Sequence, residues 1–289
     1  MIAEMNLMAD LNDILLEVLT KIQRNYKTPM RNGEIDSCKL LYDWYFYCKR
    51  HIPAFPRKVL FSKELDCPIE FEDNVEKIKQ MFINGQDVNG LLSDSIKQIN
   101  GKDMLLSYWD IYHLHLGEIK DIHITQERRR ELEKKLLFIK LYKDIVFFIS
   151  IGNHREWTDK SLLERLSKEF PESIDAYEFH GVESIEPKID DNDLSSFWKA
   201  NINTFVEVNG KKYSGLGRMS NGDDGESMII AIKKIKSIKN CEKSLKIKYG
   251  NALLNQVFWF KLRKRITSDN TYFEVFDVKT DKVFYRILA

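Results

Sequence analysis

The chain of 289 residues has little of what marks a secreted or membrane-spanning protein. Its 4 cysteines show neither C-x-x-C spacing nor a paired framework, which favours a reducing, cytoplasmic setting over a disulfide-stabilised fold. Glu4, Asp10 and Asp13 lie where a signal peptide would have a basic start and an apolar run. No apolar run approaches the roughly 20 residues that cross a bilayer. We therefore expect a soluble, cytoplasmic protein that has no membrane partner.

Glycine and proline are also scarce, with 13 and 6 residues, which leaves little room for flexible linkers. Hydrophobic residues make up 43% and charged residues 31%, so the composition is that of a globular protein and excludes a largely disordered chain. The formal net charge is only +1, so the overall charge indicates no class of partner.

The hydrophobic pattern predicts a mixed α+β fold. Residues 1–100 show apolar side chains at helical spacing, which predicts a helical N-terminal part. Three strand-length segments rich in β-branched and aromatic residues follow at 109–116, 135–142 and 145–151. Lys143-Asp144 separates the last two and predicts a tight turn, so we expect a central antiparallel sheet with a following helix.

An acidic connection divides the predicted fold. Residues 169–193 hold nine acidic residues and one lysine, a composition typical of a solvated, irregular segment. We place the boundary at 171–193, which separates a first domain over 1–170 from a basic, mixed α/β domain over 194–289.

The second predicted domain contains two hairpins and a long helix. Asn209-Gly210 predicts a hairpin turn, and residues 272–288 predict a terminal hairpin. Between them, residues 228–245 predict a helix with isoleucines at helical spacing: Ile229, Ile232, Ile235 and Ile238.

Four of the six histidines fall within 42 residues: His113, His115, His123 and His154. The period-two alternation of a strand places His113 and His115 on one face. Two imidazoles on one face can act as general base and general acid, because histidine titrates near pH 6.5. His154 follows the third predicted strand, and Arg155 beside it could pair with a phosphate.

Three interpretations of these histidines remain open. Acid/base catalysis would need no metal or other cofactor, whereas ligation of one metal by the H-x-H pair would need a third ligand from a neighbouring strand. A half-buried histidine is also often only a hydrogen-bonded core residue. The carboxylates that could orient an imidazole are Asp110, Glu118, Asp121 and Glu156, of which Asp110 falls on the strand face opposite His113.

The segment from Lys135 to Trp157 resembles the core of the bacterial RelE/ParE toxin superfamily. A basic residue leads into an apolar strand, a short acidic turn follows, and a second apolar strand ends in a G-x-H-R element at residues 152–155. The resemblance implies an endoribonuclease that acts on RNA and is paired with a protein antitoxin. The matching site residues are His154 and Arg155, with Lys135 or Arg130 as basic partners.

A basic region lies near the C-terminus. Residues 233–265 contain eleven lysines or arginines and one acid, a charge of +10, so the rest of the chain sums to −9. At its end basic side chains follow aromatic ones, a pattern that suits phosphate contact and base stacking. The predicted nucleic-acid-binding residues are Trp259, Lys261, Arg263, Lys264 and Arg265. The alternative is a helix with a solvated lysine face, whose isoleucine stripe packs inward.

These patterns together predict an endoribonuclease of the bacterial toxin or phage-defence type that acts by histidine acid/base catalysis. His113 or His115 would take the proton from a ribose 2′-OH, and His154 would protonate the leaving 5′-oxygen. Arg155 would stabilise the charge that develops on phosphate. The alternatives are a non-catalytic nucleic-acid- or protein-binding module and a metal-dependent hydrolase.

Overall fold

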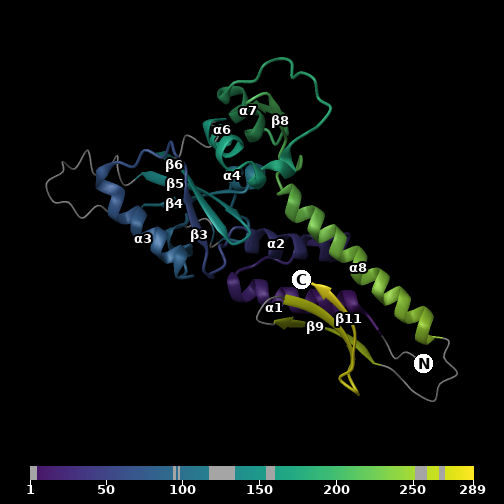
Figure 1. Ribbon diagram of the computed structural model, residues 1–289. Coiled ribbons are helices and arrows are strands. Elements are labelled where there is room, and N and C mark those ends of the chain that lie inside the picture. The colour runs from purple at the N-terminus through teal and green to yellow at the C-terminus, as the bar shows by residue number, and fades with distance from the viewer. Residues whose placement is uncertain are drawn as a thin grey trace. The chain divides into compact units, whose positions relative to one another are not determined.

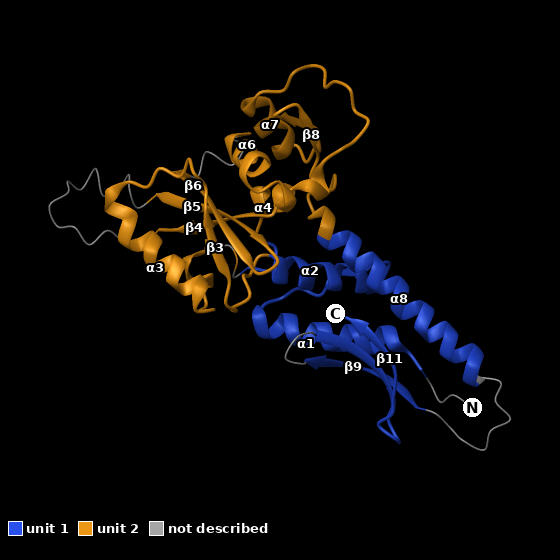
Figure 2. Cartoon of the chain, viewed as in Figure 1, with its two compact units in different colours: residues 1–49, 97–100, 227–289 blue, residues 50–96, 101–226 orange. Residues whose placement is uncertain are grey.

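The computed structural model describes residues 5–93, 96, 98–116, 134–153, 160–250, 259–266 and 271–289 (Figure 1). It has the mixed α+β fold that the hydrophobic pattern predicts. The chain forms two compact units (Figure 2): unit 1 comprises residues 1–49, 97–100 and 227–289, and unit 2 comprises residues 50–96 and 101–226. Among the helices of these described ranges, none is both long and apolar enough to cross a bilayer.

Unit 2 is built on a four-stranded sheet in the order β3-β6-β5-β4. Its strands are β3 (Lys58–Phe61), β4 (Ile111–His115), β5 (Lys135–Tyr142) and β6 (Ile145–Asn153). β5 is antiparallel to both β4 and β6, whereas β3 is parallel to β6. β3, β4 and β6 therefore run in the same direction, and their C-terminal ends lie at the same edge of the sheet.

Both faces of this sheet are covered, which explains why β5 and β6 are almost continuously apolar. On one face, α3 (Glu72–Ile83) packs its Val75, Ile78 and Phe82 against Leu137 and Phe148. The other face packs against α6 (Lys160–Glu169), α7 (Asp191–Lys199) and the hairpin of β7 (Val206–Val208) and β8 (Lys211–Tyr213). A short helix, α4 (Met104–Trp109), leads directly into β4.

Unit 1 combines helices with a three-stranded antiparallel sheet in the order β11-β10-β9. Its strands are β9 (Phe260–Ile266), β10 (Thr271–Asp277) and β11 (Val283–Leu288), and its helices are α1 (Leu7–Ile22), α2 (Ser37–Lys49) and most of α8 (Gly225–Gly250). α1 buries the leucines at positions 7, 11, 15 and 19, because a four-residue interval keeps side chains on one helix face. These leucines join Phe273 and Val275 of β10 in one core.

Short elements complete the described chain. Unit 1 includes a two-stranded hairpin of β1 (Met30–Arg31) and β2 (Glu34–Ile35). Unit 2 includes the 3-10 turns η1 (Ile69–Phe71), η2 (Asn89–Leu91), η4 (Pro171–Ser173) and η5 (Asp175–Tyr177).

The three predicted hairpin turns are present. Lys143, Asn209 and Asp281 each adopt a positive φ, and Gly210 does so beside Asn209, as tight connections between twisted strands require. The predicted strand 109–116 begins later than expected, since Trp109 ends α4 and β4 starts at Ile111.

The compact units divide the chain differently from the predicted domains 1–170 and 194–289. The segment 171–193 belongs to unit 2, where Ile174 is buried in the same core as Phe170. A few apolar residues are enough to hold an acidic segment against the core of unit 2, and the overall composition of the segment does not reveal them. The chain instead crosses between the two units after residues 49, 96, 100 and 226, the last of these in the first turn of α8.

The isoleucines of α8 do not form one inward stripe. Ile238 is buried, but Ile232 is 51% exposed and Ile229 is 39% exposed. Three residues turn a helix by about 300°, roughly 60° short of a full turn. A row of residues spaced three apart therefore winds around the helix and leaves the buried face. The buried residues of α8 include Ser227, Ala231, Ile238, Cys241 and Leu245, which are three, four or seven residues apart, the intervals that keep side chains on one helix face.

Gly215 provides a test of the packing in unit 2. A Cβ atom on this residue would lie 1.8 Å from the Tyr108 carbonyl oxygen, a backbone atom that cannot move cheaply. We expect Gly215→Ala to lower the free energy of unfolding by about 1–3 kcal/mol or more. Gly90→Ala is the matched control, since nothing lies within 4 Å of its Cβ position. Chemical denaturation of the full chain measures both, and equal effects of the two variants would contradict this packing.

Candidate functional site

His113 and His115 both lie on β4, which is an outer strand of the unit 2 sheet. Alternate residues of a strand share a face, so both imidazoles lie on the face of Ile111. Ile111 packs in the core on the α6 side, whereas Leu114 and Leu116 pack in the core on the α3 side. The predicted placement of the two histidines on one face of a strand is confirmed.

A carboxylate that the sequence did not single out lies beside His113. The Oδ2 atom of Asp103 is 3.6 Å from His113 Nδ1, and both side chains are mostly buried. Asp103 is also the N-cap of α4, because its Oδ1 accepts a hydrogen bond from the Leu106 N–H at 3.0 Å. One carboxylate thus caps the helix and faces the imidazole. The signal available in the sequence was the N-cap itself, an aspartate just before an apolar helical run.

Of the four carboxylates considered for orienting a histidine, Asp110 alone lies within the described residues. Asp110 ends α4 in a left-handed conformation, with its side chain directed to Tyr177 and Lys140. Glu118, Asp121 and Glu156 lie outside the described residues.

His154 and Arg155 also lie outside the described residues, as do His123 and Arg130. The structure does describe the strand that leads to them. Leu136 of β5 pairs with His115 on one side and with Gly152 of β6 on the other. The C-terminal end of β6, at Asn153, therefore lies at the same sheet edge as the C-terminal end of β4.

Lys140 forms a buried polar cluster on the same sheet face as the histidines. Its side chain is 3% exposed, and its Nζ donates to the Trp109 carbonyl at 2.7 Å and lies 3.9 Å from Asp110 Oδ2. The Tyr177 hydroxyl donates to the same carboxylate oxygen. Burial raises the pKa of Tyr177, and the neighbouring Asp110 raises it further, so the phenol remains a proton donor. This cluster holds the junction of α4 and β4 against β5.

The predicted nucleic-acid-binding residues of β9 do not form one patch. Lys261, Arg263 and Arg265 alternate with residues of the core, and Lys261 and Arg265 are exposed. Lys264 pairs with the buried Phe273, and its Nζ lies 4.2 Å from the centre of the Trp44 ring of α2. Burial lowers the pKa of Lys264. Lys264 therefore lies on the opposite sheet face from Lys261, Arg263 and Arg265, because the strand pleat directs neighbouring side chains to opposite faces.

Trp259 precedes β9 and is 49% exposed. Its backbone N–H donates to Asp277 Oδ1 at 2.9 Å, which fixes the entrance to the strand. The Nζ of Lys279 lies 5.5 Å from the centre of the indole. About half of the Trp259 side chain is thus open to solvent.

Glu274 lies in the middle of the unit 1 sheet and is only 2% exposed. The Nε atoms of Arg263 and Arg286 donate to its two oxygens at 3.0 and 2.9 Å. Arg263 also donates to Asp281 at 2.5 Å. Burial raises the pKa of Glu274, but the hydrogen bonds from the two arginines outweigh burial and lower it below its usual value.

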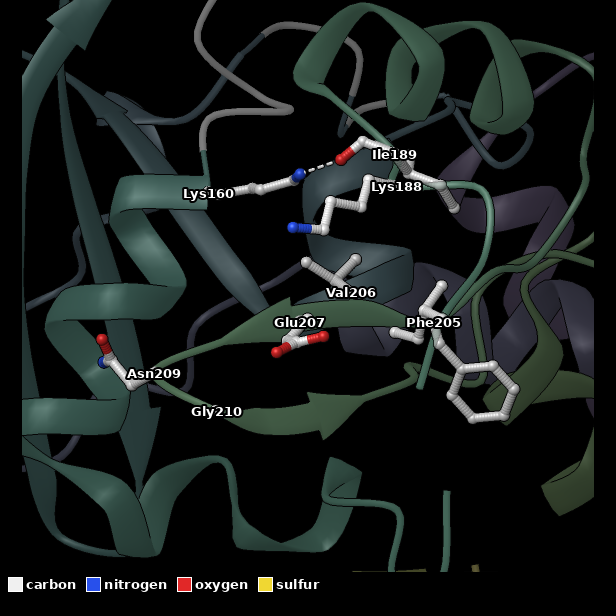
Figure 3. Close-up of a pocket in the computed structure, with 9 residues that line it drawn as sticks. Lys160, Lys188, Ile189, Phe205, Val206, Glu207, Asn209 and Gly210 are labelled. Atoms are coloured by element: carbon white, nitrogen blue, oxygen red, sulfur yellow. Dashed lines mark hydrogen bonds between the residues drawn. The ribbon is translucent and has the colours of Figure 1, made fainter. Parts of the chain in front are cut away.

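A cavity of about 290 Å³ lies elsewhere in unit 2 (Figure 3). Lys160, Lys188 and Glu207 place charged groups around it, beside the apolar Val206. Lys160 already donates to the Ile189 carbonyl, as the dashed line shows. No described histidine lines this cavity.

Within the described part of the chain, no group of three or more His, Cys, Asp or Glu side chains is arranged to hold a metal ion. Comparison of the chain with protein-family models, curated proteins and solved structures found no match.

The pKa of Glu274 gives a pH-dependent prediction. A carboxylate whose pKa is lowered by folding stabilises the protein above the unfolded value, about 4.3 for glutamate, and this stabilisation is lost as pH falls through the folded pKa. We expect Glu274→Gln to lower the Tm at pH 7 and to reduce the further fall in Tm below about pH 4.3. Thermal unfolding followed at several pH values measures both effects. Glu34→Gln changes an exposed glutamate of unit 1 and should behave like the wild type; an unchanged profile for Glu274→Gln would contradict the arginine pairing.

Proposed function

We propose that this protein cleaves RNA in the manner of bacterial toxin or phage-defence endoribonucleases, with His113 as the general base. The observation that carries the proposal is the Asp103 carboxylate, which lies 3.6 Å from His113 Nδ1 on a sheet face that also holds His115. A carboxylate in this position orients the imidazole and stabilises the imidazolium that forms when the other ring nitrogen accepts a proton. Catalytic hydrogen bonds are often long before substrate binds, so 3.6 Å is compatible with this role.

The proposed reaction is an internal transfer within the RNA backbone. His113 removes the proton of a ribose 2′-OH, and the 2′-oxygen forms a bond to the adjacent phosphorus while the bond from phosphorus to the 5′-oxygen breaks. The leaving 5′-oxygen takes a proton from His154, and the product is a 2′,3′-cyclic phosphate. Arg155 neutralises the charge that develops on the phosphate oxygens.

The strand order supports this assignment of a general acid. β4 and β6 flank β5 and run in the same direction, so His115 and the end of β6 lie at one edge of the sheet. His154 is the next residue after Asn153, the last of β6. His115 is then a second imidazole near the scissile phosphate. The superfamily resemblance adds a protein antitoxin as the partner in this proposal.

Substitution of His113 tests the proposal. We expect His113→Ala to reduce RNA cleavage by about 10²–10⁴-fold, since that is the usual contribution of a general base. Asp103→Asn should also reduce cleavage while leaving the Tm close to that of the wild type, because asparagine caps a helix as well as aspartate does. Cleavage of a labelled RNA and thermal unfolding are measured on the same preparations.

His180→Ala is the matched control, because this histidine belongs to the same unit and its side chain is 84% exposed. It should leave both cleavage and the Tm unchanged. Cleavage that survives in His113→Ala, or that falls only in proportion to unfolded protein, would refute the catalytic role and favour a non-catalytic binding module. Cleavage that is restored by adding a divalent metal after chelation would instead favour the metal-dependent hydrolase.

A further inference from the structure

The outer face of the unit 1 sheet combines cations and aromatic rings in register. On the central strand β10, Tyr272, Glu274 and Phe276 alternate with the core residues Phe273 and Val275. The two aromatic residues are partly exposed, whereas the core residues between them are buried. The pleat thus directs an aromatic, an acidic and a second aromatic side chain to the face opposite the core.

Each of these three residues pairs with a cation on β9. Tyr272 pairs with Arg265 and Glu274 pairs with Arg263. Phe276 pairs with Lys261 in the same register. A fourth cation comes from β11, where Arg286 is the partner of Glu274. The face therefore carries four cations from β9 and β11 against the carboxylates of Glu274 and Asp281.

Glu274 organises the middle of this face. It accepts hydrogen bonds from Arg263 and Arg286 on the two neighbouring strands, and burial of the carboxylate keeps this geometry in place. The guanidinium of Arg263 also lies 4.3 Å from the centre of the Phe276 ring. Ring and guanidinium form a layered surface on which a flat group can stack.

We propose that this outer face binds single-stranded nucleic acid, with bases stacked on Tyr272 and Phe276 and phosphates paired with Lys261, Arg265 and Arg286. Positive charge complements the phosphate backbone, and exposed aromatic rings can stack only on bases that are not enclosed in a duplex. The two rings are four residues apart on one strand, about 13 Å, so they would hold separate bases. This binding surface belongs to unit 1 and does not depend on the histidines of unit 2.

Lys264 and the lysines of α8 fall outside this surface. Lys264 lies on the core side, over Trp44. Lys236 and Lys243 are exposed, but on a helix whose buried residues pack in the core that the inner face of the sheet joins. Only some of the cations in the basic region 233–265 therefore lie on the outer face of the sheet. The proposal requires these cations for binding, whereas a general effect of positive charge would involve all of them equally.

Fluorescence anisotropy with labelled oligonucleotides of about 12 nucleotides, within the site sizes of known single-strand-binding folds, tests the proposal. The full chain carries His113→Ala in every arm, so that RNA is not consumed and loss of cleavage does not affect the readout. Single-stranded RNA, single-stranded DNA and a duplex of the same sequence are compared at several salt concentrations. We expect both single strands to bind more tightly than the duplex, and the ratio of RNA to DNA affinity reports whether the 2′-OH is read.

Three double variants separate the contributions. Lys261→Ala with Arg265→Ala should weaken binding and reduce the slope of log affinity against log salt by about 1.4, since each phosphate contact on a single strand contributes about 0.7. Tyr272→Leu with Phe276→Leu should weaken binding at least about fivefold with the salt slope unchanged, because stacking is lost and charge is kept. Lys236→Ala with Lys243→Ala removes the same charge from α8 and should change neither.

Thermal unfolding of each variant checks that the sheet remains folded, and Arg265→Lys serves as a milder change that keeps the charge. The proposal is overturned if the parent chain does not bind single strands at low salt or if the duplex binds as tightly. An equal loss in the α8 control would also overturn it, because binding would then follow net charge and not the sheet face. Single-strand binding by the His113→Ala chain, together with no cleavage of RNA by the wild type, would leave this proposal standing and refute the nuclease alone.

Discussion

Burial of the Lys140 ammonium is the constraint on which the architecture of unit 2 depends. A charged group in the middle of an otherwise apolar strand is costly unless hydrogen-bond acceptors surround it, and removal of one partner from such a buried pair typically costs about 3–5 kcal/mol. The acceptors here come from Trp109 and Asp110, at the junction of α4 and β4. Tyr177 joins them from the segment after α6. One side chain of β5 thus fixes two segments that are far apart in the sequence.

This anchor also places the candidate site. α4 begins at the N-cap Asp103 and ends at Asp110, where the left-handed conformation turns the chain into β4. Seven residues of helix advance about 10 Å, and three residues of strand advance about 10 Å. If the strand returns alongside the helix, His113 comes level with Asp103, which is the arrangement observed. The pairing of Asp103 with His113 thus follows from a short helix, α4, that Asp103 caps at its start and that Lys140 holds at its end.

In unit 1, the alternation of side chains along β10 separates the core from the charged outer face of the sheet. One face of its sheet packs against helices. On the other face, alternate residues of β10 lie between a partner on β9 and a partner on β11. Glu274 is nearly inaccessible on that outer face because Arg263 and Arg286 cover it. A carboxylate in this position lowers the net positive charge but fixes the direction of two guanidinium groups, and preorganised groups lose less conformational entropy when they bind a partner.

The amino-acid sequence by itself determined the local features of this protein. Helical spacing placed α1, and turn residues placed the hairpins at Lys143, Asn209 and Asp281, because these signals depend only on neighbouring residues. Strand periodicity was also sufficient to put His113 and His115 on one face. Only the tertiary structure decided which residues surround them. Asp103 is ten residues from His113, and the two cations that hold Glu274 lie on separate strands, so no spacing rule connects these groups. Composition likewise marked 171–193 as a connection, whereas a few buried side chains fold it into unit 2, since burial depends on partners that are distant in the chain.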